Sequence, residues 1–395
     1  MTSTSGWTFK ESLAKTHIDC FFDKISDIIP VLDDPAFQSA YYRFSNPGNA
    51  SLSESQNPRS RQRQCLIYSV LALGALYSET DRSGPEWATK YFAKAQGLLA
   101  YNYLGIAIRM AYSIGINDNI NPPERPFIDR EAAFRTWWTI YSLESDLCLE
   151  YGRPLSIRET DAKASYPLEN PDPKAEMASK VTFIVVMAKF ARIARKVIDL
   201  ASNISERTAA LQSFVGRMMN LQAELMTWRG ELPAHLAPKD TTTAEGFQAR
   251  GQVSWVQHQC CDIELRFNHV MLVMHRPFFA YASFSTPFYS SAMAKGVCIG
   301  AARETILLVH KLLEYPENQW TCYSHRVLAA MLVVITSIFD SSGEERATLL
   351  ELCSKSLEIF RRMRSGCPAK PVALVEDVLT QLSPGMWQAE ALVET

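Results

Sequence analysis

The chain has 395 residues, which is enough for one large domain or two ordinary ones. Hydrophobic residues make up 47%, charged residues 21%, and the formal net charge is −2, a balance typical of a soluble globular protein. No run of Lys or Arg is longer than a pair, which argues against a phosphate-binding surface for nucleic acid.

The chain shows no pattern for secretion or membrane insertion. Residues 1–7 lack the apolar core of a signal peptide, and the longest uncharged apolar run, 327–339, is too short to span a bilayer. The nine cysteines have no regular spacing, so we expect them to be reduced thiols. These features predict a protein of the nucleus or cytoplasm with no membrane association.

Helical periodicity dominates from residue 12 to the end, and we find no convincing alternating strand pattern. In 211–228, for example, Leu211, Phe214, Met218, Leu225 and Trp228 recur at three- and four-residue steps on one face. The same pattern predicts helices over 64–77, 86–99, 103–114, 130–151, 181–201, 255–275, 292–313, 326–339 and 346–363.

The predicted helices are separated by segments rich in Pro, Gly, Ser and Thr. The helix over 130–151 should end at Gly152-Arg153-Pro154, because Pro154 disfavours helical geometry in the residue before it. We therefore predict an all-α fold, a multi-helix bundle-like single domain over residues 63–395 that follows a partly unstructured N-terminal lead over 1–62.

Four segments, in this order, carry a resemblance to a known family. They are 67–76 (IYSVLALGAL), 103–111 (YLGIAIRMA), 134–154 ending in Gly-Arg-Pro, and 272–278 (LVMHRPF). Together they resemble the fungal-specific transcription factor domain, the regulatory middle region of zinc binuclear cluster transcription factors. The resemblance is strongest over about residues 65–280 and implies the same all-helical regulatory fold.

Two departures from the family pattern stand out. The family's upstream DNA-binding zinc cluster needs six closely spaced cysteines, and here only Cys20 and Cys65 precede residue 148. We therefore expect no direct nucleic-acid binding through this chain. In addition, only residues 100–102 separate the helices that end at Leu99 and begin at Tyr103, where the family normally has another apolar helix.

Three acids lie in the helix predicted over 130–151. Glu144 matches a position where the family commonly has an acid, so we interpret it as a structural acceptor for a basic partner, with Arg109 and Arg153 as candidates. Asp146 and Glu150 share another face one turn apart, at positions that the family keeps apolar. That face is either solvated or the wall of a polar pocket.

Further residues could line a binding site for a small apolar molecule. Trp138, Tyr141 and Tyr151 recur at helical spacing and suit either the core or an apolar ligand cavity. Arg153, His275 and Arg276 end helices in motifs that match the family. The simpler interpretation of His275 and Arg276 is that they cap the carbonyl end of their helix.

We expect no metal and no cofactor. His258, Cys261 and Asp262 lie within one turn of each other, but they form no recognised ligand motif, and buried hydrogen-bonded histidines are far more common. Glycine-rich phosphate loops, nucleophile elbows and His-Glu-x-x-His are also absent from the sequence.

The leading functional hypothesis is a regulatory protein that acts by binding a small effector or a protein partner, with a homodimer as an open alternative. A role in secondary metabolism would suit an apolar effector. The rival hypothesis is a biosynthetic enzyme of the same fold that cyclises, isomerises or dehydrates an apolar metabolite, with Asp146 and Glu150 as acid–base groups. A structural adaptor protein is a third hypothesis, and it predicts a large exposed apolar patch.

Overall fold

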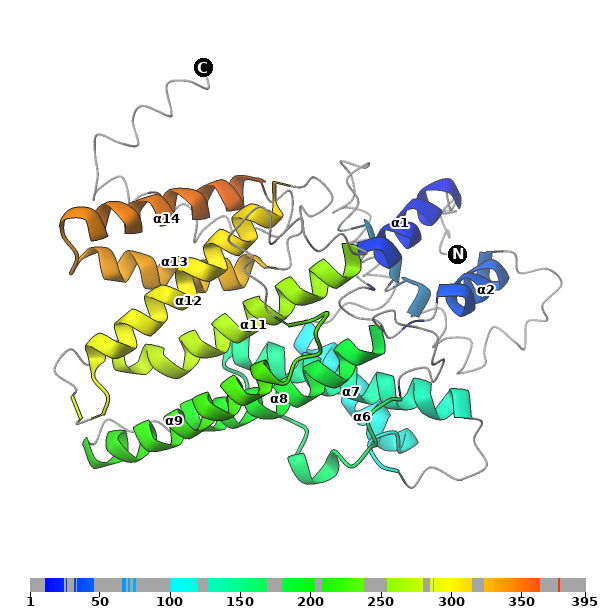
Figure 1. Cartoon of the computed structure of the whole chain (residues 1–395). Helices are drawn as coiled ribbons and strands as arrows, with labels where there is room; N and C mark the ends of the chain where they lie inside the picture. Colours follow the sequence, from blue (N-terminus) through cyan, green and yellow to red (C-terminus); the bar gives the residue numbers. More distant parts are fainter. Residues whose placement is uncertain are drawn as a thin grey trace, which may run out of the picture. The chain divides into compact units, whose positions relative to one another are not determined.

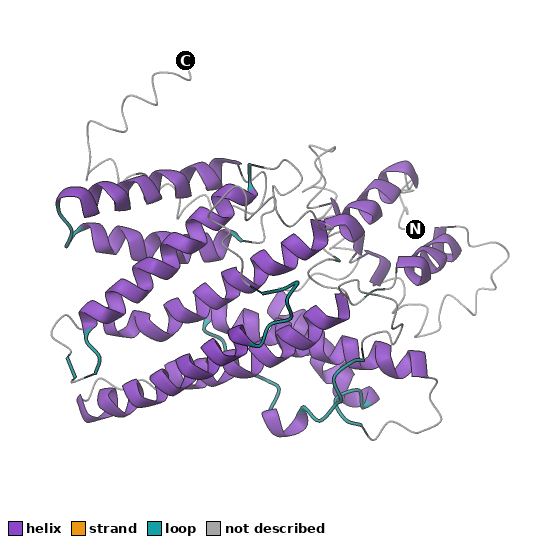
Figure 2. Ribbon diagram, viewed as in Figure 1, coloured by secondary structure: helices purple, strands orange, loops and turns teal. Residues whose placement is uncertain are grey.

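The computed structural model describes residues 11–24, 26, 32, 34–45, 66–68, 70–71, 74–75, 100–119, 127–168, 180–202, 208–237, 254–279, 285–286, 288–314, 323–362 and 376. This part of the chain is almost entirely helical and contains no strand, apart from one isolated bridge between Ser285 and Ser290 (Figure 2). The prediction of an all-α fold is confirmed. In the same residues, no helix has the length and apolar character that crossing a membrane requires.

The chain divides into two compact units (Figure 1). The first consists of residues 1–239 and 248–263, and the second of residues 240–247 and 264–395, so the boundary falls inside α11 (Ser254–Phe279). The described helices of the first unit are α1 (Glu11–Lys24), α2 (Asp34–Ser45), α6 (Ala100–Ile114), α7 (Phe127–Tyr151), the short 3-10 helix η1 (Glu159–Asp161), α8 (Lys180–Ser202) and α9 (Thr208–Gly230). Those of the second are α12 (Ser291–Leu312), α13 (Ser324–Ile338) and α14 (Gly343–Arg362).

In the first unit, α7 packs against both α6 and α8, and α8 packs against α9. A helix covered on two sides must be apolar around most of its circumference. Trp137, Trp138 and Tyr141 of α7 are accordingly fully buried, together with Ala188 and Ala191 of α8. These small alanines let the large rings of α7 lie close to α8.

The N-terminal segment contributes a second apolar cluster to this unit. Ile18 and Phe21 of α1 pack with Phe37 of α2 and with Ile67 and Leu71 of the following helical segment. Segment 1–62, predicted as a partly unstructured lead, therefore contains two helices, α1 and α2.

In the second unit, α12, α13 and α14 pack against one another and lie side by side (Figure 1). Ser290 caps α12, because its hydroxyl accepts a hydrogen bond from the backbone N–H of Met293. Helix α14 carries Glu344 and Glu345 in its first turn and Arg361 and Arg362 in its last, a distribution that complements the helix dipole.

Most predicted helices coincide with observed ones to within three residues at each end. The predicted break at Gly152 is confirmed: α7 ends at Tyr151, and Gly152 takes a φ of 61°, which glycine tolerates. Helix α11 continues past Pro277 to Phe279 instead of ending at it, with the proline in its last turn. The helix predicted over 86–99 lies outside the described residues.

Gly74 provides a test of the packing of α1. A Cβ atom at Gly74 would lie 1.7 Å from the backbone carbonyl oxygen of His17, a contact that no side-chain movement can relieve. We expect Gly74→Ala to lower the free energy of unfolding by several kcal/mol, on the order of other severe overpacking changes. The measurement is urea denaturation followed by circular dichroism.

Gly105→Ala in α6 is the matched control, because nothing lies within 4 Å of a Cβ there. It should be neutral or stabilise the chain by up to about 1 kcal/mol, the helix preference of alanine over glycine. Equal stability of Gly74→Ala and Gly105→Ala would contradict the close approach of Gly74 to the His17 carbonyl oxygen of α1.

Candidate functional site

The polar centre of the first unit is an ion pair buried between α7 and α8. Glu144 of α7 is 1% exposed and Arg195 of α8 is 4% exposed, and Arg195 Nη1 lies 2.9 Å from Glu144 Oε2. Two charges this deeply buried are stable only if further hydrogen bonds replace the water they have lost. The surroundings of the pair supply these bonds.

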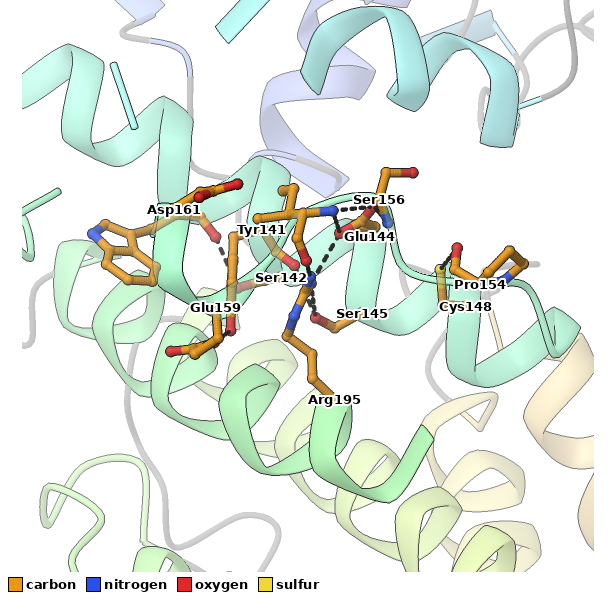
Figure 3. A network of polar contacts seen from close by, with 12 residues as sticks. Tyr141, Ser142, Glu144, Ser145, Cys148, Pro154, Ser156, Glu159, Asp161 and Arg195 are labelled. Carbon is orange, nitrogen blue, oxygen red and sulfur yellow. Dashed lines mark hydrogen bonds and ion pairs between the residues drawn. The ribbon is translucent and has the colours of Figure 1, made fainter. Parts of the chain in front are cut away.

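Both the carboxylate of Glu144 and the guanidinium group of Arg195 have further partners besides each other (Figure 3). The Glu144 carboxylate accepts hydrogen bonds from the backbone N–H groups of Ser156 at 2.6 Å and Ile157 at 3.2 Å. Arg195 donates to the hydroxyl of Ser145 at 3.1 Å and to the carbonyl oxygen of Ile157. Its guanidinium group also lies over the ring of Tyr141, 4.3 Å from the centroid. The pair therefore joins α7, α8 and the loop after α7.

A second layer of polar contacts lies nearer the surface. The buried hydroxyl of Tyr141 donates to the carboxylate of Glu159, which forms an ion pair with Arg192 at 3.3 Å. Arg192 lies over the ring of Trp138 at 5.3 Å, and Trp138 Nε1 donates to the carbonyl oxygen of Ser165 at 2.9 Å. Burial is the main reason why the pKa of Tyr141 is raised above its usual value, so its hydroxyl is a hydrogen-bond donor.

The loop that completes this layer runs from residue 152 to 168 and is held at both ends. At its start, the backbone N–H of Arg153 donates to the carbonyl oxygen of Cys148. Further on, the backbone N–H groups of Lys163 and Ala164 donate to the carbonyl oxygen of Asn117, just beyond α6. With Arg195 of α8, which donates to the carbonyl oxygen of Ile157, the loop backbone has partners on α7, on α8 and on the segment after α6.

Beside this loop, α8 and α9 line an open hollow of about 820 Å³. Its lining carries apolar side chains together with positively and negatively charged ones. The lining residues are Leu155, Ile157, Arg158, Glu159, Lys189, Arg192, Ile193, Arg195, Lys196, Asp199, Glu224, Thr227, Trp228 and Glu231. The hollow thus shares Ile157, Glu159, Arg192 and Arg195 with the two polar layers.

The structure places the predicted aromatic and basic residues in different environments. Trp138 and Tyr141 are buried and belong to the polar layers, whereas Tyr151 and Arg153 are exposed at the end of α7. Glu144 has the basic partner that the sequence predicted, but the candidates for it were wrong. Arg109 and Arg153 are exposed, and the partner is Arg195, which lies 51 residues downstream.

Asp146 and Glu150 lie on α7 and are both half-buried. Each makes polar or electrostatic interactions, so neither is a free carboxylate. They do not line the hollow between α8 and α9. At about 100° per residue, Asp146 and Glu150 lie on another face of α7 than Glu144.

His275 and Arg276 belong to the second unit, near the end of α11. Arg276 is exposed in the last turn, but His275 is buried, and its Nδ1 lies 2.5 Å from the hydroxyl oxygen of Tyr289. Burial lowers the pKa of His275 to about 4, so it is a neutral hydrogen-bonding group rather than a charged cap. Among the described residues, no three His, Cys, Asp or Glu side chains are arranged to hold a metal ion.

His269, two turns earlier in α11, is also buried, and neither of its ring nitrogens has a hydrogen-bond partner. Burial, and after it the positive charges of Arg326, Arg276 and Arg266, lower its pKa to about 3. This histidine is neutral at physiological pH.

The sequence interpretation missed Arg192 and Arg195, although a signal for Arg195 exists. In the apolar stripe of α8, Ala188 and Ala191 are followed by Arg195 at the next helical step, where an apolar residue is expected. An arginine within a buried stripe calls for a buried acid, and Glu144 is the acid on the facing helix.

The fold and the site define the class of protein: an all-α domain whose central helices are joined by a buried ion pair beside an open, charged hollow. The chain matches the family described as "fungal specific transcription factor domain" over residues 18–98 and 87–230, more than half of its length. The chain therefore belongs to the fungal specific transcription factor domain family. The two matched stretches overlap at residues 87–98.

Curated relatives are fungal regulators. A transcriptional regulatory protein of Schizosaccharomyces pombe is 24% identical over 66% of this chain and 32% of its own length. The "activator of stress genes protein 1" of Candida albicans is 23% identical over 70% of this chain and 35% of its own length. An "ABC-transporter-regulating transcription factor" of Aspergillus fumigatus is 20% identical over 83% of this chain and 41% of its own length.

The chain thus spans about a third to two fifths of the length of these relatives. No solved structure matches it. The relatives are described as transcriptional regulators, and the chain shares with them this family domain.

Removing one member of the buried pair tests its role in the fold. We expect Arg195→Met to lower the free energy of unfolding by about 3–5 kcal/mol, because it leaves Glu144 buried without its charge partner. The double change Glu144→Gln with Arg195→Met should recover much of this loss. The measurement is urea denaturation of each variant at one pH.

Lys196, the residue after Arg195, supplies the control. Lys196 pairs with Glu224 on the surface, with side chains 53% and 43% exposed, so Lys196→Met should change stability by less than about 1 kcal/mol. Equal effects of Arg195→Met and Lys196→Met would contradict a structural role for the buried pair.

The buried histidines predict a loss of stability in acid. Their pKa is lower in the folded chain than the unfolded value of 6.5, so below that pH the unfolded chain binds protons that the folded chain excludes. Each histidine should reduce the free energy of unfolding by up to about 1.4 kcal/mol per pH unit from 6.5 down towards 4. Thermal denaturation between pH 7.5 and about 5 measures this slope.

His269→Leu should flatten the slope, since leucine replaces a buried ring that has no hydrogen-bond partner and takes up no proton. An unchanged slope in this variant would show that His269 does not account for the acid sensitivity.

Proposed function

We propose that this protein regulates transcription and that an effector bound in the hollow between α8, α9 and the loop 155–159 controls it. One observation carries the proposal: the hollow shares residues with the buried polar network that joins α7 to α8. A molecule in the hollow would touch Arg192 and Arg195 directly. Binding there would change contacts that reach the centre of the unit.

The construction of the loop supports this role. Ile157 lines the hollow, donates its N–H to Glu144, and accepts a hydrogen bond from Arg195 through its carbonyl oxygen. A shift of the loop would therefore disturb the partners of both buried charges. Since an unpaired buried charge is costly, the loop and the ion pair favour a small number of discrete arrangements.

The relatives support the transcriptional half of the proposal, because they are described as transcriptional regulators and activators. We propose that the protein acts in the nucleus and that the residues of this chain do not contact DNA themselves. A protein partner is the alternative occupant of the hollow, and a homodimer remains an open arrangement. The charged side chains of the lining favour a polar effector over the fully apolar one expected from the sequence. In secondary metabolism, the effector would then be a polar metabolite.

The enzyme hypothesis gains no support from the relatives, which are described as regulators. Its two acid–base candidates, Asp146 and Glu150, lie outside the lining of the hollow.

A reporter assay tests the proposed function. The chain, fused to a bacterial DNA-binding domain in a fungal host, should change expression of a reporter with matching operator sites. Ile193→Trp should reduce that change, because Ile193 lines the hollow and the larger side chain would take up part of its volume. Ile193 is also a buried residue of α8, so circular dichroism must show that the variant is folded.

Arg217→Gln on the exposed face of α9 is the control and should behave as the unchanged chain. A fusion that never alters the reporter, together with native mass spectrometry that finds no small molecule bound, would contradict regulation through an effector.

A further inference from the structure

The outer face of α9 carries a row of small and apolar residues without any charge. The inner face of this helix packs on α8, where the rings of Trp228 and Phe190 lie 4.9 Å apart and Trp228 Nε1 donates to the carbonyl oxygen of Val186. The opposite face is exposed and bears five residues at alternating three- and four-residue steps, which we call the α9 seam: Gly216, Met219, Ala223, Met226 and Gly230. The outer face of a surface helix is normally polar or charged, so the seam suggests a contact with another helix.

The seam follows the a and d positions of a heptad, the repeat by which two helices pack along each other. Glycine or alanine occupies the a positions 216, 223 and 230, and methionine occupies the d positions 219 and 226. Met219 is 43% exposed and Met226 is 51% exposed, although methionine is among the residues most often buried. The charged residues of the helix lie beside the seam and not in it: Arg217, Glu224 and Arg229.

Gly216 supports the same interpretation. A glycine inside a helix makes the helix less stable than an alanine would, so its presence usually has a packing reason. Among the described residues, nothing lies within 4 Å of the position that a Cβ would take at Gly216, and its φ is not positive. A second helix would supply the reason, because a missing side chain lets another backbone approach closely.

We propose that the α9 seam binds the seam of a second copy of this chain in antiparallel orientation. Antiparallel pairing places the a positions of one helix against the d positions of the other, so each methionine packs over a glycine or an alanine. Large side chains then fill the spaces that small ones leave, as close packing requires. Parallel pairing would set small residues against small ones and methionine against methionine, which leaves gaps in some layers and crowds others.

The spacing of the seam favours a second copy over an unrelated helix. Met219 and Met226 lie at equal distances along the helix from the point between Gln222 and Ala223. A two-fold axis through that point exchanges the two methionines, which gives the self-complementary contact of a symmetric dimer. The residues that border the seam near the axis are neutral: Asn220, Gln222 and Thr227. Pairing of two copies therefore brings no like charges together there.

The size of the seam sets the strength of the dimer. The seam is about 21 Å long, because it spans 14 helical steps of about 1.5 Å. A helix-to-helix contact of this length buries less than the roughly 800 Å² per partner of a standard interface. The dimer should therefore have a dissociation constant in the micromolar range or above, so its population depends on protein concentration.

Sedimentation equilibrium of the full chain between about 1 and 300 µM tests the dimer. We expect a monomer–dimer equilibrium without larger species, because a two-fold contact closes on itself. Met226→Glu should raise the dissociation constant by about tenfold or more, because it places charges in an apolar contact. Met110→Glu on α6 is the matched control: Met110 is 45% exposed, and its change should leave the dissociation constant as it is.

Two further variants test the orientation and the packing. Residue 219 of one copy lies near residue 226 of the other in the antiparallel pair, so Met219→Lys combined with Met226→Glu should recover association that either single change loses. In a parallel pair, the same combination would oppose like charges and weaken association further. Ala223→Leu should weaken the dimer, since the larger side chain takes the space of a methionine, whereas unspecific apolar association would gain from the added surface.

The outcomes decide the proposal. A chain that stays monomeric at about 300 µM overturns it, and so does a Met226→Glu variant that associates as well as Met110→Glu. Tighter association of Ala223→Leu would also overturn it. Circular dichroism should show unchanged helix content in these variants, because every substituted residue is exposed. The proposed function does not depend on this dimer, since the hollow is lined by residues of one chain.

Discussion

The buried ion pair between Glu144 and Arg195 is the constraint on which the first unit depends. Both charges lie in the contact between α7 and α8, where water cannot compensate them. They are tolerated because two backbone N–H groups, a carbonyl oxygen and a serine hydroxyl complete their hydrogen bonds. Three of these partners belong to the loop after α7. A movement of the loop would therefore break hydrogen bonds of the buried ion pair.

This arrangement connects the hollow at the surface of the first unit with the ion pair at its centre. The loop contributes Ile157 to the lining of the hollow, and the backbone N–H of the same residue donates to the buried carboxylate of Glu144. Arg192 and Arg195 extend the link, one towards the surface and one towards the core. A molecule bound in the hollow, as we propose, would therefore change the contacts of the buried ion pair between α7 and α8.

Much of the fold could be predicted from the sequence because helix periodicity is a local property. The long amphipathic patterns give the helices and their approximate ends, and Gly152 marks the end of α7 through its own backbone freedom. The need of Glu144 for a basic partner is predicted from the family resemblance, because the family commonly has an acid at this position. The identity of the partner is not, because Arg109, Arg153 and Arg195 all satisfy the chemistry.

The sequence by itself determined the helical class and the family, because helix periodicity and the order of the four family segments are both recorded along the chain. Only the tertiary structure decided that α8 supplies the arginine, that Trp138 and Tyr141 belong to the core layers, and that the hollow lies on α8 and α9. These facts depend on which helix faces pack against one another. That pairing is set by the packing of side chains far apart in the chain, so no single segment carries it.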